Sequence, residues 1–138
     1  MSLLSRLFQS SKNSVPADLS VLGTDFHSHF IPGIDDGAKT MEDSLELIKG
    51  MAGFGYKKVI TTPHVMSDHY RNTPEIILGG LAKVKAAVKE AGIPIEVEAA
   101  AEYYLDFDLE RKMLEEQLLT FGKNYFLFEL SFMNPPDN

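Results

Sequence analysis

The chain has 138 residues, of which 44% are hydrophobic, and a formal net charge of −7 at neutral pH. This size and apolar content suit one soluble domain with a hydrophobic core. The absence of cysteine excludes disulfides, thiolate metal ligands and a cysteine nucleophile. Because binding to nucleic acid or to anionic membranes depends on clustered lysine and arginine, the negative charge argues against both as partners.

Residues 1–20 are expected to form a flexible tail. Their apolar group is too short for the core of a signal peptide, and no stretch of about 20 apolar residues follows that would span a membrane. We therefore expect a cytoplasmic protein without a transmembrane segment. A short amphipathic helix that docks on a partner is the alternative interpretation of this tail.

The first half of the chain alternates strand and helix patterns. A short apolar strand is predicted at residues 21–27. Thr40 has the position of an N-cap before apolar residues at helical spacing, so a helix is predicted from there to Gly53. The β-branched run at residues 57–62 predicts a buried strand, and a polar loop is expected at residues 65–72.

The second half continues this alternation. Thr73 as N-cap and Pro74 at the first helical position predict a helix that stops at Gly92. The remaining elements are a strand, a helix and a strand, predicted at residues 95–99, 108–118 and 125–130. Strands that alternate with helices predict an α/β fold with a parallel sheet and right-handed crossovers.

A His-x-His pair lies where the first strand is predicted to end. His27 and His29 alternate with Ser28, so in an extended backbone both imidazoles project to the same side and can bind one cation. Asp35 and Asp36 follow in the next loop. Imidazole together with carboxylate suits a divalent cation that keeps open positions for water, which favours hydrolysis over a structural role. For the two histidines alone, a chance pair at the surface is the alternative.

Two further candidate ligands follow other strands. His64 comes after the second predicted strand, and Glu102 comes after the third. In parallel α/β folds function collects at the carboxyl ends of the strands, so we expect both to join the His-x-His pair. Four strands are too few to close a parallel barrel, which normally has about eight. The pattern is therefore that of about half a barrel.

Three segments resemble the polymerase and histidinol phosphatase (PHP) superfamily: residues 25–38 (DFHSHFIPGIDDGA), 61–64 (TTPH) and 101–104 (AEYY). Within it they are most similar to the bacterial manganese-dependent tyrosine phosphatases of capsular and exopolysaccharide synthesis, over about residues 22–136. The resemblance implies a distorted (β/α)7 barrel with a cluster of up to three metal ions. It also implies a substrate, the phosphotyrosine tail of a polysaccharide-regulating bacterial tyrosine kinase.

Carried onto this sequence, the resemblance makes five residues metal ligands and parts of the catalytic site. His27 and His29 would bind one ion, Glu102 would bridge two ions, and Asp36 and His64 would bind the neighbouring ions. Manganese is the expected metal, with iron or zinc as alternatives. Such ions would activate a water molecule and stabilise an in-line displacement at phosphorus without a covalent phosphoenzyme.

Other residues near these motifs have two interpretations each. Asp35 would support the loop or the ligands instead of binding metal. Arg71 and His69 are candidates for binding the substrate phosphate, with a solvated loop as the alternative. Tyr103 and Tyr104 would face an aromatic substrate or pack within the barrel.

The resemblance is incomplete in one respect. The family has further histidine and aspartate ligands in its second half, whereas this sequence has no histidine after His69. We therefore expect residues 21–138 to form a truncated PHP domain with an incomplete metal site.

Three alternative functions stay open. Another PHP phosphoesterase, such as a histidinol-phosphate phosphatase, would use the same ligands. A noncatalytic half-barrel would oligomerise through the open edge of its sheet, because exposed strand edges attract partners, and a homo-oligomer is expected. A receiver-type domain would explain the acidic pair Asp35-Asp36, but it would need an aspartate in place of Glu102.

Overall fold

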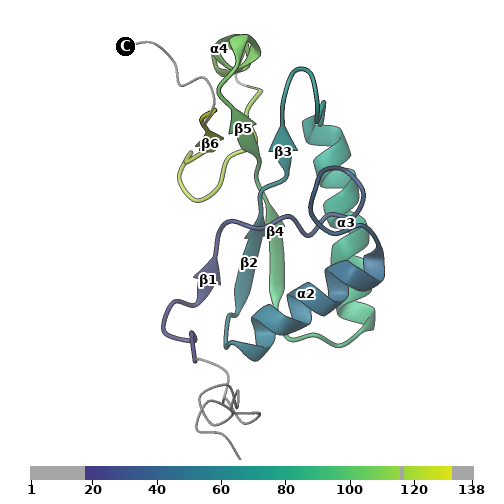
Figure 1. Ribbon diagram of the computed structural model, residues 1–138. Coiled ribbons are helices and arrows are strands. Elements are labelled where there is room, and N and C mark those ends of the chain that lie inside the picture. Colours follow the sequence, from purple (N-terminus) through teal and green to yellow (C-terminus); the bar gives the residue numbers. More distant parts are fainter. Residues whose placement is uncertain (1–17, 116, 132–138) are drawn as a thin grey trace, which may run out of the picture.

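The computed structural model describes residues 18–115 and 117–131 (Figure 1). Its helices and strands are, in chain order, β1 (Thr24–Asp25), α2 (Met41–Gly53), β2 (Lys58–Thr61), β3 (His64–Val65), α3 (Pro74–Glu90), β4 (Glu96–Ala99), β5 (Glu102–Tyr104), α4 (Phe107–Leu114) and β6 (Leu127–Glu129). The predicted flexible tail lies outside the described residues as far as residue 17. At its end, the Leu19 N–H donates to the Phe54 carbonyl and so ties residue 19 to the end of α2.

All strand pairs are parallel, as predicted for an α/β fold. One three-stranded sheet has the order β1-β2-β4, and the other has the order β3-β5-β6. Thr62-Pro63 separates β2 from β3, and Ala100-Ala101 separates β4 from β5. Figure 1 shows β3 continuing beyond β2, and β5 beyond β4. The predicted second and third strands correspond to β2 and β4, whereas β3 and β5 were not predicted. Val65, expected in a polar loop, is a buried residue of β3.

The first strand is much shorter than the predicted range of residues 21–27. The N–H groups of Leu22 and Gly23 donate to the carbonyls of Leu19 and Ser20, so this stretch forms turns. Val21 is 89% exposed. Gly23 has a φ of +69°, a left-handed conformation that interrupts an extended chain before β1.

The two longer helices begin at their predicted N-caps. The Thr40 side chain accepts the Asp43 N–H while the Asp43 carboxylate accepts the Thr40 N–H, which completes a capping box for α2. The Thr73 side chain accepts the Ile76 N–H at the start of α3. The helices pack against each other, and α3 also packs on β4. Both lie on the same side of the strands in Figure 1.

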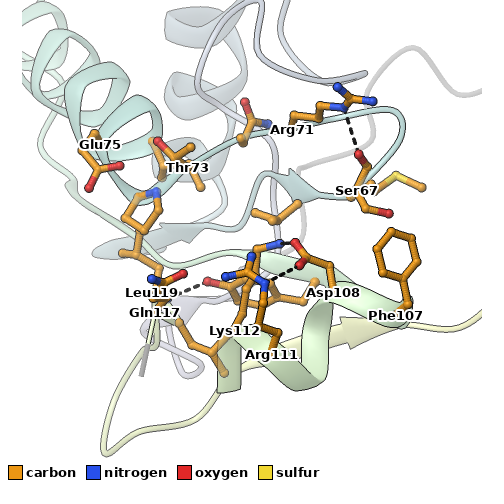
Figure 2. A pocket seen from close by; sticks show the side chains of 17 residues that line it. Ser67, Arg71, Thr73, Glu75, Phe107, Asp108, Arg111, Lys112, Gln117 and Leu119 are labelled. Atoms are coloured by element: carbon orange, nitrogen blue, oxygen red, sulfur yellow. Dashed lines mark hydrogen bonds and ion pairs between the residues drawn. The ribbon is translucent and has the colours of Figure 1, made fainter. Parts of the chain in front are cut away.

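Helix α4 begins one residue earlier and ends four residues earlier than the predicted range of 108–118. Asp106 is its N-cap and accepts the Asp108 N–H. The Gln117 N–H donates to the Lys112 carbonyl, a hydrogen bond that closes a helix end. Between α4 and the start of α3 lies an open cavity of about 780 Å³ (Figure 2).

The hydrophobic core lies between the helices and the sheet. Ile48 from α2, Ile77 and Val84 from α3, and Val59 from β2 have no exposed surface. Burial of such side chains contributes roughly 1.5–3 kcal/mol each and fixes the helices on the strands. Within the described ranges, no helix combines the length and the apolar content that crossing a membrane requires.

Candidate metal centre

The predicted histidines come together at the carboxyl ends of the first strands. His27 and His29 follow β1, and their ring centroids lie 5.6 Å apart. His64 begins β3, and its ring centroid lies 4.6 Å from that of His29. The parallel register pairs His64 with Glu102 of the neighbouring strand β5. Three separate segments of the chain thus contribute to one cluster.

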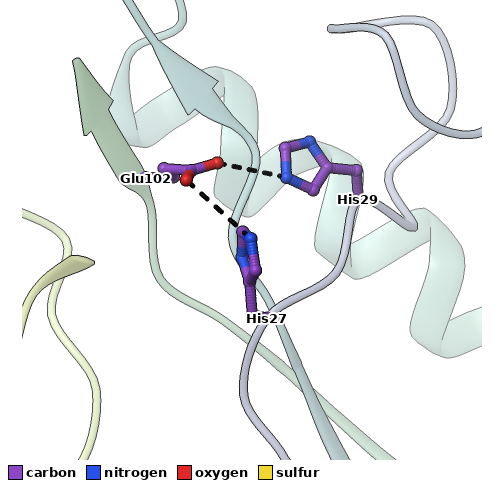
Figure 3. A group of neighbouring side chains, drawn as sticks. All are labelled: His27, His29 and Glu102. Atoms are coloured by element: carbon purple, nitrogen blue, oxygen red, sulfur yellow. Dashed lines mark ion pairs between the residues drawn. The ribbon is translucent and has the colours of Figure 1, made fainter. Parts of the chain in front are cut away.

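Glu102 occupies the centre of this cluster and is 7% exposed. Its Oε1 lies 3.8 Å from His27 Nε2, and its Oε2 lies 3.3 Å from His29 Nε2. The same Oε2 lies 3.2 Å from His64 Nδ1. Figure 3 shows the imidazoles of His27 and His29 turned towards the carboxylate. Both oxygens of the Glu102 carboxylate therefore face imidazole nitrogens, and Glu102 could bind a metal ion together with them.

Two further carboxylates complete the cluster. Asp36 Oδ1 lies 3.6 Å from both His29 Nδ1 and His64 Nε2. Glu129 Oε2, from β6, lies 3.8 Å from His64 Nδ1. Three overlapping groups place all their ligand atoms within 4.8 Å of one another: His27, His29 and Glu102; His29, Asp36 and His64; His64, Glu102 and Glu129.

Glu129 was not predicted as a ligand, because no motif surrounds it. The signal that was present is its place at the end of the last predicted strand, where the same rule that selected His64 and Glu102 applies. The structure brings together the five predicted ligands and adds Glu129. Their role as ligands stays a prediction.

The donor set fits a divalent cation. His64 Nδ1 is buried and has no hydrogen-bond partner within residues 18–115 and 117–131, although carboxylate oxygens face it. A buried polar atom without a partner is costly, and a cation between the nitrogen and these oxygens would remove the cost. Mixed nitrogen and oxygen donors suit zinc, manganese or iron.

Asp35 lies behind His29 and has no exposed side-chain surface. Its Oδ2 lies 2.8 Å from His29 Nδ1 and accepts the His64 N–H at 3.0 Å, and its Oδ1 accepts the Gly37 N–H. Burial opposes ionisation of Asp35, but these hydrogen bonds outweigh it and hold its pKa below the ordinary value. The hydrogen bond to Asp35 raises the pKa of His29 against the opposing effect of burial.

The loop that carries Asp36 is fixed at close range. A Cβ added to Gly37 would lie 2.3 Å from both the Cβ and the carbonyl oxygen of His29, so only glycine fits. Asn72, buried and not singled out by the sequence, donates from Nδ2 to the Ile34 carbonyl at 3.0 Å and to the His64 carbonyl at 2.8 Å. The Asn72 side chain therefore joins the loop that carries Asp36 to β3.

The two residues predicted to bind phosphate are not members of the three candidate ligand groups. Arg71 donates from Nε to the Ser67 carbonyl and lines the cavity between α3 and α4 (Figure 2). His69 contacts Tyr70, whose ring stacks on His64 at 5.5 Å between centroids. Tyr70 thus links His69 to the cluster.

Tyr103 is buried away from the candidate ligands. Its hydroxyl accepts the Leu119 N–H at 2.6 Å, and its ring contacts Phe126. These contacts favour the packing role over contact with a substrate.

Comparisons with known proteins agree on one family. Residues 23–137 match the family model described as capsular polysaccharide synthesis, CpsB/CapC. The tyrosine-protein phosphatase YwqE of Bacillus subtilis is 28% identical over 113 residues, 81% of this chain and 44% of the relative. The tyrosine-protein phosphatase CpsB of Streptococcus agalactiae is 29% identical over 108 residues, 78% of this chain and 44% of the relative.

A solved structure shares the fold. It is described as one of the crystal structures of YwqE from Bacillus subtilis and CpsB from Streptococcus pneumoniae, unique metal-dependent tyrosine phosphatases. The TM-score is 0.72 at 28% identity, and the match covers 79% of this chain and 44% of that chain. This chain therefore spans less than half the length of the relatives it matches. The resemblance drawn from three short segments is confirmed at the level of the family. The chain belongs to the CpsB/CapC family of capsular polysaccharide synthesis.

Proposed function

We propose that this chain provides the metal-binding part of a phosphotyrosine phosphatase that works by attack of water on phosphorus. The observation that carries the proposal is the position of Glu102, whose two oxygens face His27, His29 and His64 at the carboxyl ends of parallel strands. The relatives named above are tyrosine-protein phosphatases, which supports phosphotyrosine as the substrate.

The metal would be divalent, and manganese is our first choice, with iron or zinc as alternatives. When bound, such cations lower the pKa of a water molecule and neutralise phosphate oxygens. The residues that would hold them are His27, His29, Asp36, His64, Glu102 and Glu129. Asp35 and Thr62 would hold the imidazoles in place. Asp35 Oδ2 lies 2.8 Å from His29 Nδ1, and Thr62 Oγ1 lies 2.9 Å from His27 Nδ1.

The parallel strands would form part of a distorted (β/α)7 barrel, and residues 21–138 would belong to one PHP domain. Support comes from the strand order and from the position of the cluster at the strand ends. Because the relatives are more than twice as long as the matched part, we expect the complete site of the family to include further ligands from outside this stretch. Activity of this chain alone is therefore the point to test.

The natural substrate would be the phosphotyrosine tail of a bacterial tyrosine kinase that regulates polysaccharide synthesis, and this chain would act in the cytoplasm. The family description supports this context. Histidinol phosphate is the competing substrate within the same superfamily, and comparison of the two substrates separates the alternatives.

The test uses the full chain purified without chelator. We expect bound divalent metal, and hydrolysis of a phosphotyrosine peptide that increases with added manganese and is lost in Glu102→Gln. Glu46→Gln, an exposed carboxylate on α2, is the matched control and should behave like the unaltered chain. Turnover that survives complete removal of metal would rule out the proposed chemistry. If the chain shows neither bound metal nor turnover, this stretch is inactive by itself.

A noncatalytic role in assembly is the second candidate, and the edge strand β6 favours it. Within the described part of the chain β6 pairs only with β5, and Phe128 and Leu130 near this edge are 50% and 44% exposed. An unpaired edge beside apolar side chains attracts another strand. Sedimentation analysis should then show a homo-oligomer that Phe128→Lys disrupts, whereas a monomer at all concentrations would exclude this role.

A further inference from the structure

We propose that Asp35 is a positioning residue that keeps a proton on Nδ1 of His29 and thereby presents Nε2 of His29 to a metal ion. The first argument is the hydrogen bond of 2.8 Å between Asp35 Oδ2 and His29 Nδ1. A carboxylate can only accept, so the proton of this bond belongs to the imidazole. In the neutral imidazole, Nε2 then has the free electron pair that a metal requires. The inference deepens the metal site of the proposed function and rests on it.

The surroundings of Nε2 show what it meets. Nε2 of His29 lies 3.3 Å from Oε2 of Glu102. Once Nδ1 holds the proton, Nε2 and the carboxylate oxygen are both acceptors, and they repel each other unless a cation lies between them. A second proton or a metal ion supplies that cation. By holding the proton on Nδ1, Asp35 therefore leaves two acceptors facing each other, Nε2 of His29 and Oε2 of Glu102, and a divalent ion between them would bind to both.

The oxygens of Asp35 are already used in hydrogen bonds, and this distinguishes its role from that of Asp36. Both of its oxygens accept hydrogen bonds, from His29, His64 and Gly37, and its side chain has no exposed surface. The Asp36 side chain is 62% exposed, and one of its oxygens lies 3.6 Å from ring nitrogens of two histidines. The two adjacent carboxylates thus have different roles. Asp36 has an oxygen available to bind a metal, whereas Asp35 holds the imidazole of His29.

The same oxygen of Asp35 also links two candidate ligands from different strands. Oδ2 is shared by the His29 ring and by the main-chain N–H of His64. Hydrogen bonds from such supporting carboxylates fix the tautomer and the orientation of ligating imidazoles, and their loss typically costs 10–100-fold in metal affinity. Asp35 should therefore affect binding without touching the metal.

Asp35→Asn is the sharp variant because it keeps the size of the side chain. If the amide nitrogen faces His29, it donates to Nδ1 and moves the imidazole proton to Nε2. If the amide oxygen faces His29, the nitrogen opposes the Gly37 N–H. Neither orientation satisfies all three donors that Asp35 accepts. Glu46→Gln on the exposed face of α2 is the matched control.

The first readout is the tautomer of His29 in the metal-free full chain, taken from two-bond ¹⁵N–¹H NMR spectra at a pH that keeps the imidazoles neutral. The chain has 4 histidines, so the signals can be assigned by single substitutions. We expect the Nδ1–H form in the unaltered chain and in Glu46→Gln, and a shift towards Nε2–H in Asp35→Asn. An Nε2–H form of His29 in the unaltered chain would overturn the proposal, and this result does not depend on how the variant folds.

The second readout is manganese affinity, measured by electron paramagnetic resonance titration. We expect Asp35→Asn to bind manganese about 10–100-fold more weakly than the control variant. Equal affinity in a folded Asp35→Asn would also overturn the proposal. If the unaltered chain binds no manganese, the proposed function fails, while the tautomer spectra still decide the role of Asp35.

Discussion

Removal of the Asn72 side chain should loosen the connection between the loop that carries Asp36 and strand β3. In Asn72→Ala, the carbonyls of Ile34 and His64 lose donors at 3.0 and 2.8 Å. Each hydrogen bond contributes about 1 kcal/mol net, so the free energy of unfolding should fall by about 2 kcal/mol. For a domain of this size that loss lowers the Tm by about 8 °C. We expect weaker manganese binding as well, since both joined segments carry candidate ligands.

The assay is urea and thermal unfolding followed by circular dichroism in the presence of chelator, so that metal binding does not contribute. Asp68 is an exposed residue of the loop between β3 and α3 that also contains Asn72, and Asp68→Ala is the control. This control should change the free energy of unfolding by less than about 0.5 kcal/mol. Asn72→Asp should lose more stability than Asn72→Ala at pH 7, because a carboxylate would face two carbonyl oxygens. A loss in Asn72→Ala no larger than that of the control would refute the reasoning.

Three further outcomes are expected. Gly37→Ala should weaken manganese binding and cost about 1–3 kcal/mol of unfolding free energy, because the new Cβ would lie 2.3 Å from His29; unchanged titration and unfolding curves would contradict this. Tyr103→Phe should cost about 1–3 kcal/mol in urea unfolding, since the Leu119 N–H loses its acceptor. Burial raises the pKa of Tyr103, so its hydroxyl stays protonated to a higher pH in the folded chain than in the unfolded chain. The free energy of unfolding should therefore fall as the pH rises above 10.0 in the unaltered chain, and it should fall less steeply in Tyr103→Phe. Manganese at 100 times its Kd should raise the unfolding free energy by about 2.7 kcal/mol, and less in Glu129→Gln at the same concentration; equal stabilisation in both would exclude Glu129 as a ligand.

Sequence patterns were sufficient to predict the α/β class, the beginnings of α2 and α3, and the family. Thr40 and Thr73 are N-caps because a hydroxyl satisfies N–H groups a few residues ahead, and this depends only on local chain geometry. The candidate ligands could also be predicted from the sequence, because alternation along a strand and the position of strand ends are properties of short segments.

Features that depend on contacts between separate segments became visible only in the folded chain. Asn72 was recognised only through its hydrogen bonds to the carbonyls of Ile34 and His64. Glu129 lies at a predicted strand end, and the contact of its Oε2 with His64 Nδ1, from a residue 65 positions earlier in the chain, places it in the cluster. Arg71 was predicted to bind phosphate because of its charge and its loop position, and only the folded chain shows that it lines the cavity beside α4. Strand interruptions, side-chain direction and shared hydrogen bonds are set by packing and register across the sheet, because each requires partners that no local sequence pattern specifies.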